Sequence, residues 1–214
     1  MKKFSLLLAG LLFVTLSMGC GSDEVVEVID LNRVLDVMTA TLDELKSTPV
    51  EGVDKNAEGT ETTATKTLAK EDIALFLRQF EKNLNAAKLL STPIGAGMSK
   101  SGAITGFTDQ DKNGIRDGSD KLLFTIEMDG EGERLIATDI QNQYRRDTHY
   151  SGGGMGGFFT GYLIGSMLMG QRTMGIPPSR YSNMKMSSSN YHKAAVSKAS
   201  ARSSGGSRSF KSGK

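Results

Sequence analysis

The chain has 214 residues, a formal net charge of +2 and a single cysteine, which excludes a disulfide bond within one chain. All 24 acidic residues lie between Asp23 and Asp147. Of the 26 Lys and Arg residues, two precede residue 20 and nine follow Asp147, so residues 20–147 hold 15 basic residues and carry a charge of −9, whereas residues 148–214 carry +9. This asymmetry indicates different partners for the two parts of the chain.

Residues 1–19 have the pattern of a secretory signal peptide, because two lysines precede an apolar run over residues 4–18. The run ends in Leu-Ser-Met-Gly-Cys20, which resembles the lipobox of bacterial lipoproteins, with Ser17 where that family more often has leucine. The resemblance implies that Cys20 is acylated and anchors the protein to membrane lipid in the bacterial cell envelope without spanning it. The alternative is an ordinary cleavage site followed by a free thiol.

Two amphipathic helices are expected next. Apolar residues recur at spacings of 3, 1, 3, 4 and 3 from Leu31 to Leu45, with Asp30 available as the N-cap, and again from Ile73 to Ala87. Residues 50–66 contain few apolar groups and are expected to form a flexible loop. We expect the two helices to form an antiparallel pair facing one core.

The sequence from Asp109 to Asp120 has the most specific chemical pattern in the chain. Acidic or amide side chains occupy loop positions 1, 3, 5, 9 and 12, and Gly114 occupies position 6. Alternating oxygen ligands on a tightly turning loop suit a hard cation such as Ca²⁺, and the glycine permits the sharp turn. The alternative is a solvated polar turn without an ion.

This loop partly fits the EF-hand pattern, but Asp120 replaces the final glutamate and the flanking residues are typical of strands. With an apolar residue at position 7, it resembles a single thrombospondin type 3 loop. That resemblance implies calcium ligands from five side chains and the carbonyl of Ile115. The implied ligand residues are Asp109, Asp111, Asn113, Ile115, Asp117 and Asp120.

Strands are expected on both sides of the loop. Residues 103–108 precede it, alternating apolar and polar residues follow over 121–128, and a turn at 129–132 leads into a further strand over 134–139. Residues 20–147 are therefore predicted to form a small acidic α+β domain, with a helix pair and a β-hairpin next to the Asp-rich loop.

Residues 148–175 form a glycine-rich apolar segment, in which Gly153, Gly157, Gly161 and Gly165 recur every four residues. In a helix they would line one side and let another helix approach closely. Three interpretations stay open: a transmembrane glycine zipper, a segment buried against the protein or a partner, and a flexible low-complexity tail.

Residues 176–214 are rich in Ser, Gly, Lys and Arg and are expected to form a disordered basic tail. Its charges suit anionic lipid or cell-wall polymer, or the tail serves only solubility. Nucleic acid is not an expected partner, since an exported lipoprotein should not meet it.

No catalytic motif is recognisable, and the two histidines lie in the glycine-rich flank and the tail. An enzyme is therefore not expected. The leading hypothesis is a lipid-anchored envelope protein with a calcium-stabilised domain that acts as a structural or interaction protein through protein or membrane contacts. The expected protein partner is a second copy of the chain or another envelope protein. The alternative is a membrane-active helical oligomer formed through the glycine zipper. An enzyme would require a deep pocket around Asp109 and Asp139.

Overall fold

The computed structural model describes residues 28–46, 63–141, 143–150 and 158–204. Two long helices, α1 (Leu31–Lys46) and α2 (Thr63–Ala86), precede the strands β1 (Ile94–Met98), β2 (Ile104–Thr108), β3 (Leu122–Asp129), β4 (Arg134–Asp139) and β5 (Arg145–His149). The chain continues into α3 (Phe158–Thr173), the short α4 (Ser179–Ser182) and α5 (Tyr191–Ser204). The predicted mixed α+β class is confirmed.

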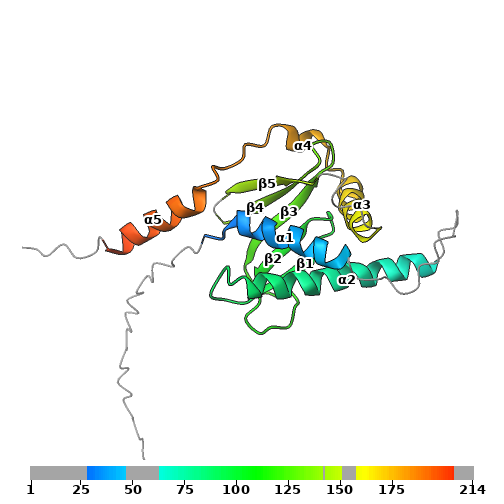
Figure 1. Ribbon diagram of the computed structural model, residues 1–214, viewed down its shortest axis with the longest axis horizontal. Helices are drawn as coiled ribbons and strands as arrows, with labels where there is room; N and C mark the ends of the chain where they lie inside the picture. Colours follow the sequence, from blue (N-terminus) through cyan, green and yellow to red (C-terminus); the bar gives the residue numbers. More distant parts are fainter. Residues whose placement is uncertain (1–27, 47–62, 142, 151–157, 205–214) are drawn as a thin grey trace, which may run out of the picture.

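The strands form an antiparallel sheet in the order β1-β2-β3-β4-β5, so each strand pairs with its neighbours in sequence. The helices gather around it, with α1 against β4 and β5, α2 against β1, and α3 against β3 (Figure 1). The hydrophobic core lies between the sheet and these helices. Its fully buried members include Met38, Phe76, Phe80, Phe124, Ile126, Leu135, Leu163 and Met167.

The first helix forms as its sequence predicts. Leu31, Val34 and Leu42 are fully buried on one face, and the carboxylate of Asp30 accepts a hydrogen bond from the backbone N–H of Asn32 at 3.1 Å, which caps the helix. Polar contacts fix its direction relative to α2, because Arg33 bonds Ala87, Thr41 bonds Asn83 and Glu44 bonds Gln79. The antiparallel helix pair is therefore confirmed.

The structure corrects the C-terminal boundary of the loop that was expected over residues 50–66. Residues 50–62 lie outside the described residues, but α2 begins at Thr63. Its first residues, Thr-Ala-Thr-Lys, contain neither Gly nor Pro, so nothing in them breaks a helix that is already forming.

The strands expected beside the loop and in the hairpin are confirmed as β2, β3 and β4. Strands β1 and β5, at the two edges of the sheet, were not predicted. The first, Ile-Gly-Ala-Gly-Met, has little strand propensity. It is held from outside by Asn85 of α2, whose side chain bonds both the N–H of Ile94 at 2.9 Å and its carbonyl at 2.8 Å. The second, Arg-Arg-Asp-Thr-His, is wholly polar.

Helix α3 packs against the body of the protein. Leu163 and Met167 are fully buried, and the side chain of Gln171, 5% exposed, donates to the carbonyl of Met128 at 2.9 Å. Gly170 meets the turn between β1 and β2 so closely that a Cβ added there would lie 2.5 Å from the backbone nitrogen of Gly102. Of the three interpretations of residues 148–175, burial against the protein describes the part over 158–173.

Within the described ranges, none of the helices combines the length and the apolar character needed to cross a membrane. Helix α3 has 16 residues, and its side chains Leu163, Ile164 and Met167 are buried in the core that it shares with α1, α2 and β3.

The prediction of a disordered tail over 176–214 is wrong for its described part, residues 176–204. Tyr181 is 1% exposed and Tyr191 is 5% exposed. Ser187 exchanges hydrogen bonds with Arg145 at the outer edge of β5, at 2.8 and 3.0 Å. Composition underestimates this order, because two tyrosines and a few hydrogen bonds to the body attach a segment that has few apolar residues of its own.

Candidate functional site

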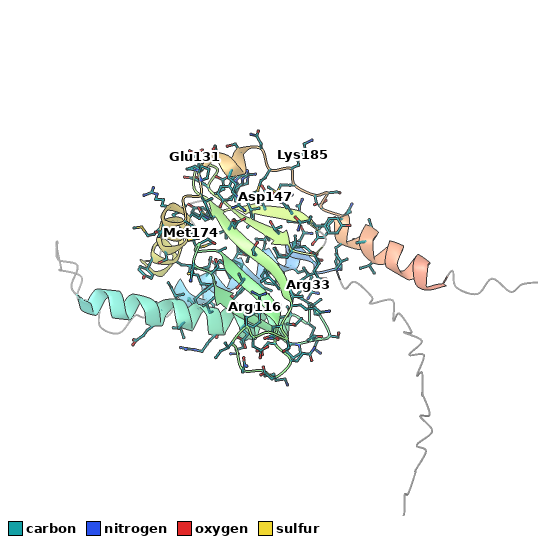
Figure 2. The ribbon with its side chains drawn as sticks, turned by 180° about the vertical axis from the view of Figure 1, so that it is seen from behind. Arg33, Arg116, Glu131, Asp147, Met174 and Lys185 are labelled. Carbon is teal, nitrogen blue, oxygen red and sulfur yellow. The ribbon has the colours of Figure 1, made fainter. Side chains whose placement is uncertain are left out.

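The Asp-rich loop connects β2 to β3, and its base is closed by the strands themselves. The N–H of Thr108 donates to the carbonyl of Lys121 at 2.9 Å, and the N–H of Lys121 donates to the Thr108 hydroxyl at 2.8 Å. Arg116, near the tip of the loop, lies at the opposite end of the sheet from Glu131 in the β3–β4 turn (Figure 2). The loop is therefore set apart from the hairpin turn.

The first half of the loop is organised around Asp109, which is 2% exposed. Its two carboxylate oxygens accept the backbone N–H groups of Asn113 at 3.1 Å and Gly114 at 3.0 Å. Gly114 has a φ of +69°, the left-handed conformation in which glycine is favoured. Asp111 accepts from the amide side chain of Asn113 at 2.8 Å. The sharp turn predicted at Gly114 is present.

The second half is closed by Asp117 and Asp120. The backbone N–H of Asp117 donates to the Asp120 carboxylate at 3.0 Å, and both the N–H and the hydroxyl of Ser119 donate to Asp117. These bonds from Ser119 hold the pKa of Asp117 below its ordinary value. The side chain of Ile115 is 68% exposed and points away from any core.

A carboxylate outside the predicted motif also lies at the loop. A Cβ added to Gly114 would come 3.8 Å from the Oε2 atom of Glu81, which belongs to α2. Burial raises the pKa of Glu81, the negative charge of Asp109 raises it further, and a hydrogen bond from the backbone of Ala96 opposes both effects. The spacing of the loop motif contains no signal for Glu81, because α2 brings it there through the tertiary fold.

The predicted calcium ligands do not converge in this arrangement. Among the described residues, which include the whole loop, there is no group of three or more His, Cys, Asp or Glu side chains that could hold a metal ion. The oxygens of Asp109, Asp111 and Asp117 face backbone or side-chain donors of the loop itself. A calcium ion would require these carboxylates to move closer together, and calcium binding stays a prediction.

The other predicted site residues have different positions. Cys20, Gly153 and Gly157 lie outside the described residues. Gly161 and Gly165 lie on α3, where a Cβ added to either would meet nothing within 4 Å, so they face away from the body. The glycine of this helix that makes a close contact is Gly170, which the four-residue repeat does not include.

The sequence patterns did not predict a junction between the start of the described chain and the segment that leads into α5. We call it the terminal clasp, formed by residues 28–32 and 187–192. The Tyr191 hydroxyl donates to the carbonyl of Ile29 at 2.7 Å and accepts from the N–H of Leu31, and its ring lies 4.7 Å from that of Tyr144. Arg146 of β5 donates to both sides, to Asn32 and to the carbonyl of Ser187, each at 2.7 Å.

A second polar cluster fastens α4 to the sheet. Arg134 bonds Asp129 at 2.8 Å, Asp147 at 2.9 Å and the carbonyl of Tyr181 at 3.0 Å. Burial alone would raise the pKa of Asp129, but the hydrogen bonds from Arg134 and Gly132, with the charge of Arg134, outweigh it and leave the pKa below its ordinary value. These charged groups are matched by partners that hold the fold together.

No protein-family model, curated protein or solved structure matches this chain. Its function is therefore inferred from the residues and their geometry.

Proposed function

We propose that the protein is a lipid-anchored protein of the bacterial cell envelope that acts as a structural or interaction protein. The observation that carries the proposal is the short separation in sequence between Cys20 and the first residue of the folded core. Ile29, already 2% exposed and part of the core, is nine residues from the cysteine that ends the signal-like segment. The lipobox-like sequence and the position of the lone cysteine support acylation at that point.

An anchor so near the body limits where the protein can act. Seven residues separate Cys20 from Val28, and since an extended chain spans about 3.3–3.6 Å per residue, the tether can reach no further than about 30 Å. The body would stay close to the membrane surface, and its partners would be membrane lipids and proteins that extend from the same membrane.

The paired charges of the body support a structural or interaction role. Asp129 and Asp147 pair with Arg134, Asp109 binds the backbone of its own loop, and Glu127 lies 3.3 Å from Arg180. Each of these carboxylates has a partner that stabilises the fold.

The anchor is tested by metabolic labelling with a fatty acid. We expect Cys20→Ser to abolish incorporation of the label and to block processing of the signal segment. The matched control is Ser17→Leu, which restores the residue more common in lipoproteins and should keep the label. If Cys20→Ser still incorporates the fatty acid, the anchor is not at this cysteine and the proposal fails.

Calcium is a separate element of the proposal. The side-chain pattern of residues 109–120 and the left-handed turn at Gly114 support it, and the neighbouring Glu81 adds a further carboxylate that a cation would neutralise. The role we propose for calcium is structural, since it would hold the β2–β3 connection in one conformation.

A second candidate is self-association through α3, favoured by the open space at Gly161 and Gly165. Met169, one turn further along, is 64% exposed, so the outer side of the helix presents two glycines and an apolar side chain to solvent. Because Leu163 and Met167 are buried in the body, the contact would join folded protomers. We expect Gly161→Leu to reduce crosslinked oligomers while Cys20 labelling is unchanged, and equal crosslinking would exclude this surface.

A further inference from the structure

The first turn of α5 is fixed to the segment where the described chain begins. Tyr191 bonds Ile29 and Leu31, as described above. His192 adds two contacts, with its Nε2 atom 3.0 Å from the carbonyl oxygen of Val28 and its Nδ1 atom 3.7 Å from the carboxylate of Asp30. Helix α5 therefore starts at the same place from which the chain leads back toward Cys20.

Beyond this first turn the helix leaves the body. Both views show α5 extending away from the sheet and the other helices (Figures 1 and 2). Lys193 and Ala194 are exposed and Val196 is 46% exposed, while Ala195 is the last buried residue whose side chain is described. Helix α5 thus forms an arm attached at its base to the terminal clasp.

The charge of this arm is opposite to that of the body. Lys193, Lys198 and Arg202 lie within α5, three more basic residues follow before the end of the sequence, and no acidic residue occurs after Asp147. Residues 20–147, by contrast, carry a charge of −9. A surface rich in negative charge would repel the body and attract the arm.

We propose that α5 is a membrane-contacting arm whose partner is the anionic phospholipid headgroups of the membrane that holds Cys20. The proposal rests on the lipid anchor proposed above. Clusters of Lys and Arg beside a membrane bind anionic lipid within a Debye length of its surface, about 8–10 Å at moderate salt.

The lengths of tether and arm agree with this placement. The base of α5 lies next to Val28, which the tether keeps within about 30 Å of the lipid attached to Cys20. A helix of 14 residues is about 21 Å long, so the arm can lie along the headgroups without detaching Tyr191 or His192. The body would then be oriented with the terminal clasp toward the membrane.

The test is flotation of the full-length Cys20→Ser chain with two kinds of vesicle, phosphatidylcholine alone and phosphatidylcholine with phosphatidylglycerol at 3:1. The Cys20→Ser change removes the acyl group, and the neutral vesicles control for binding by residues 1–19. The arm variant is Lys193→Gln, Lys198→Gln and Arg202→Gln in one chain. The matched variant removes the same charge from three exposed body residues by Arg78→Gln, Lys100→Gln and Arg116→Gln.

We expect the parent chain to prefer the anionic vesicles, with the preference lost in 0.5 M salt. The arm variant should bind them at least about tenfold more weakly than the parent, because each basic residue near the surface adds about a factor of five. The matched variant should stay within about twofold of the parent, and both variants should keep the parental melting temperature.

Two results would overturn the proposal. One is equal binding by the arm variant and the matched variant. The other is retention of the parent chain on polyphosphate-coated beads but not on anionic vesicles, which would assign the arm to a polymer. Fatty-acid labelling of the unmodified chain separates this proposal from the anchor. If Cys20 is labelled but the arm variant binds vesicles as the parent does, the anchor is supported and the role of the arm is excluded. If the arm variant binds more weakly but no label is incorporated, the arm is supported and the anchor is excluded.

Discussion

The carboxylates of Glu81 and Asp109 belong to different elements, yet the charge of one raises the pKa of the other across the base of the loop. Burial of Glu81 is the larger cause, and both effects favour its protonated form in the folded state. The folded protein therefore binds this proton more tightly than the unfolded chain does. The stability that Glu81 contributes is present at low pH and is lost as the pH rises from about 4.3 through the raised pKa.

It follows that Glu81→Gln should stabilise the protein at neutral pH. Glutamine keeps an oxygen for the N–H of Ala96 and removes the charge beside Asp109. Since Glu81 is partly solvated, we expect a modest rise in melting temperature, about 1–2 °C at pH 7 and none at pH 4. Glu71→Gln, on an exposed position of the same helix, is the control; it relieves only a secondary repulsion on Asp72 and should raise the melting temperature less than Glu81→Gln does. A lower melting temperature for Glu81→Gln at pH 7 would contradict the charge argument.

Calcium should raise the melting temperature if the loop binds it. Extracellular modules bind Ca²⁺ with dissociation constants of about 10⁻⁴–10⁻³ M. At tenfold that concentration the ion adds about 1.4 kcal/mol to the free energy of unfolding, or about 3–5 °C. Asp111→Ala should remove this increment while leaving the calcium-free melting temperature within about 1 °C. Calorimetry that detects neither binding heat nor a calcium-dependent shift would leave a polar turn.

Two glycines of α3 should respond oppositely to the same substitution. Gly170→Ala forces a methyl group into the backbone of Gly102, and we expect it to lower the free energy of unfolding by about 1–3 kcal/mol. Gly161→Ala adds a methyl group in open space and should raise it by about 0.5–1 kcal/mol, since alanine favours the helix. Chemical denaturation measures both, and a stabilising Gly170→Ala would mean that α3 is not docked there.

Tyr191→Phe should weaken the terminal clasp specifically. The change leaves the N–H of Leu31 and the carbonyl of Ile29 without their buried partner, which costs about 1–3 kcal/mol. Hydrogen exchange should accelerate at the start of α1 and in α5, and much less in β2 and β3. Tyr162→Phe, which alters a half-buried tyrosine on α3, is the comparison and should cost less than about 0.5 kcal/mol.

Tyr181 should make the protein sensitive to alkaline pH. Burial and the negative charge of Glu127 raise the pKa of Tyr181 to about 12. Because the raised pKa means that the folded state retains the proton, the stability contributed by neutral Tyr181 is lost as the pH rises from about 10 toward 12. We expect Tyr181→Phe to reduce the dependence of melting temperature on pH above 10 without abolishing it, because burial also raises the pKa of Tyr191. Ultraviolet titration that assigns Tyr181 an ordinary pKa would exclude this.

The sequence predicted those helices and strands whose own residues carry a periodic pattern of apolar side chains. Leu31, Val34 and Leu42 repeat with the period of a helix, and Phe124, Ile126 and Met128 alternate as a strand does, so both elements could be predicted. Strand β1 could not, because its glycines give it little strand propensity and its first residue, Ile94, is held by Asn85 from another element. The turn over residues 109–120 could be predicted from the sequence. The presence of Glu81 beside that turn could not, because the position of Glu81 depends on how α2 packs.

The tail shows the same limit more clearly. Tyr191 bonds backbone groups 160 and 162 positions earlier, and no window of sequence contains both partners. Composition measures how much apolar surface a segment can bury, but two aromatic rings in preformed sites attach a polar segment that composition classes as disordered. The glycine repeat was expected to mark the side of a helix that packs closely against a neighbour. At Gly161 and Gly165 it instead marks the outer side of the helix, where a Cβ would meet nothing.

The distance in sequence between Tyr191 and Ile29 also sets an order of assembly. The five strands pair with their neighbours, so each hairpin can close as soon as its second strand has been synthesised. The start of α1 must wait for residue 191, when nearly nine-tenths of the chain has been made. A chain that stops before Tyr191 would hold its sheet and the contacts of α1 with α2, but it would leave the start of α1 without its tyrosine partner and open to proteases.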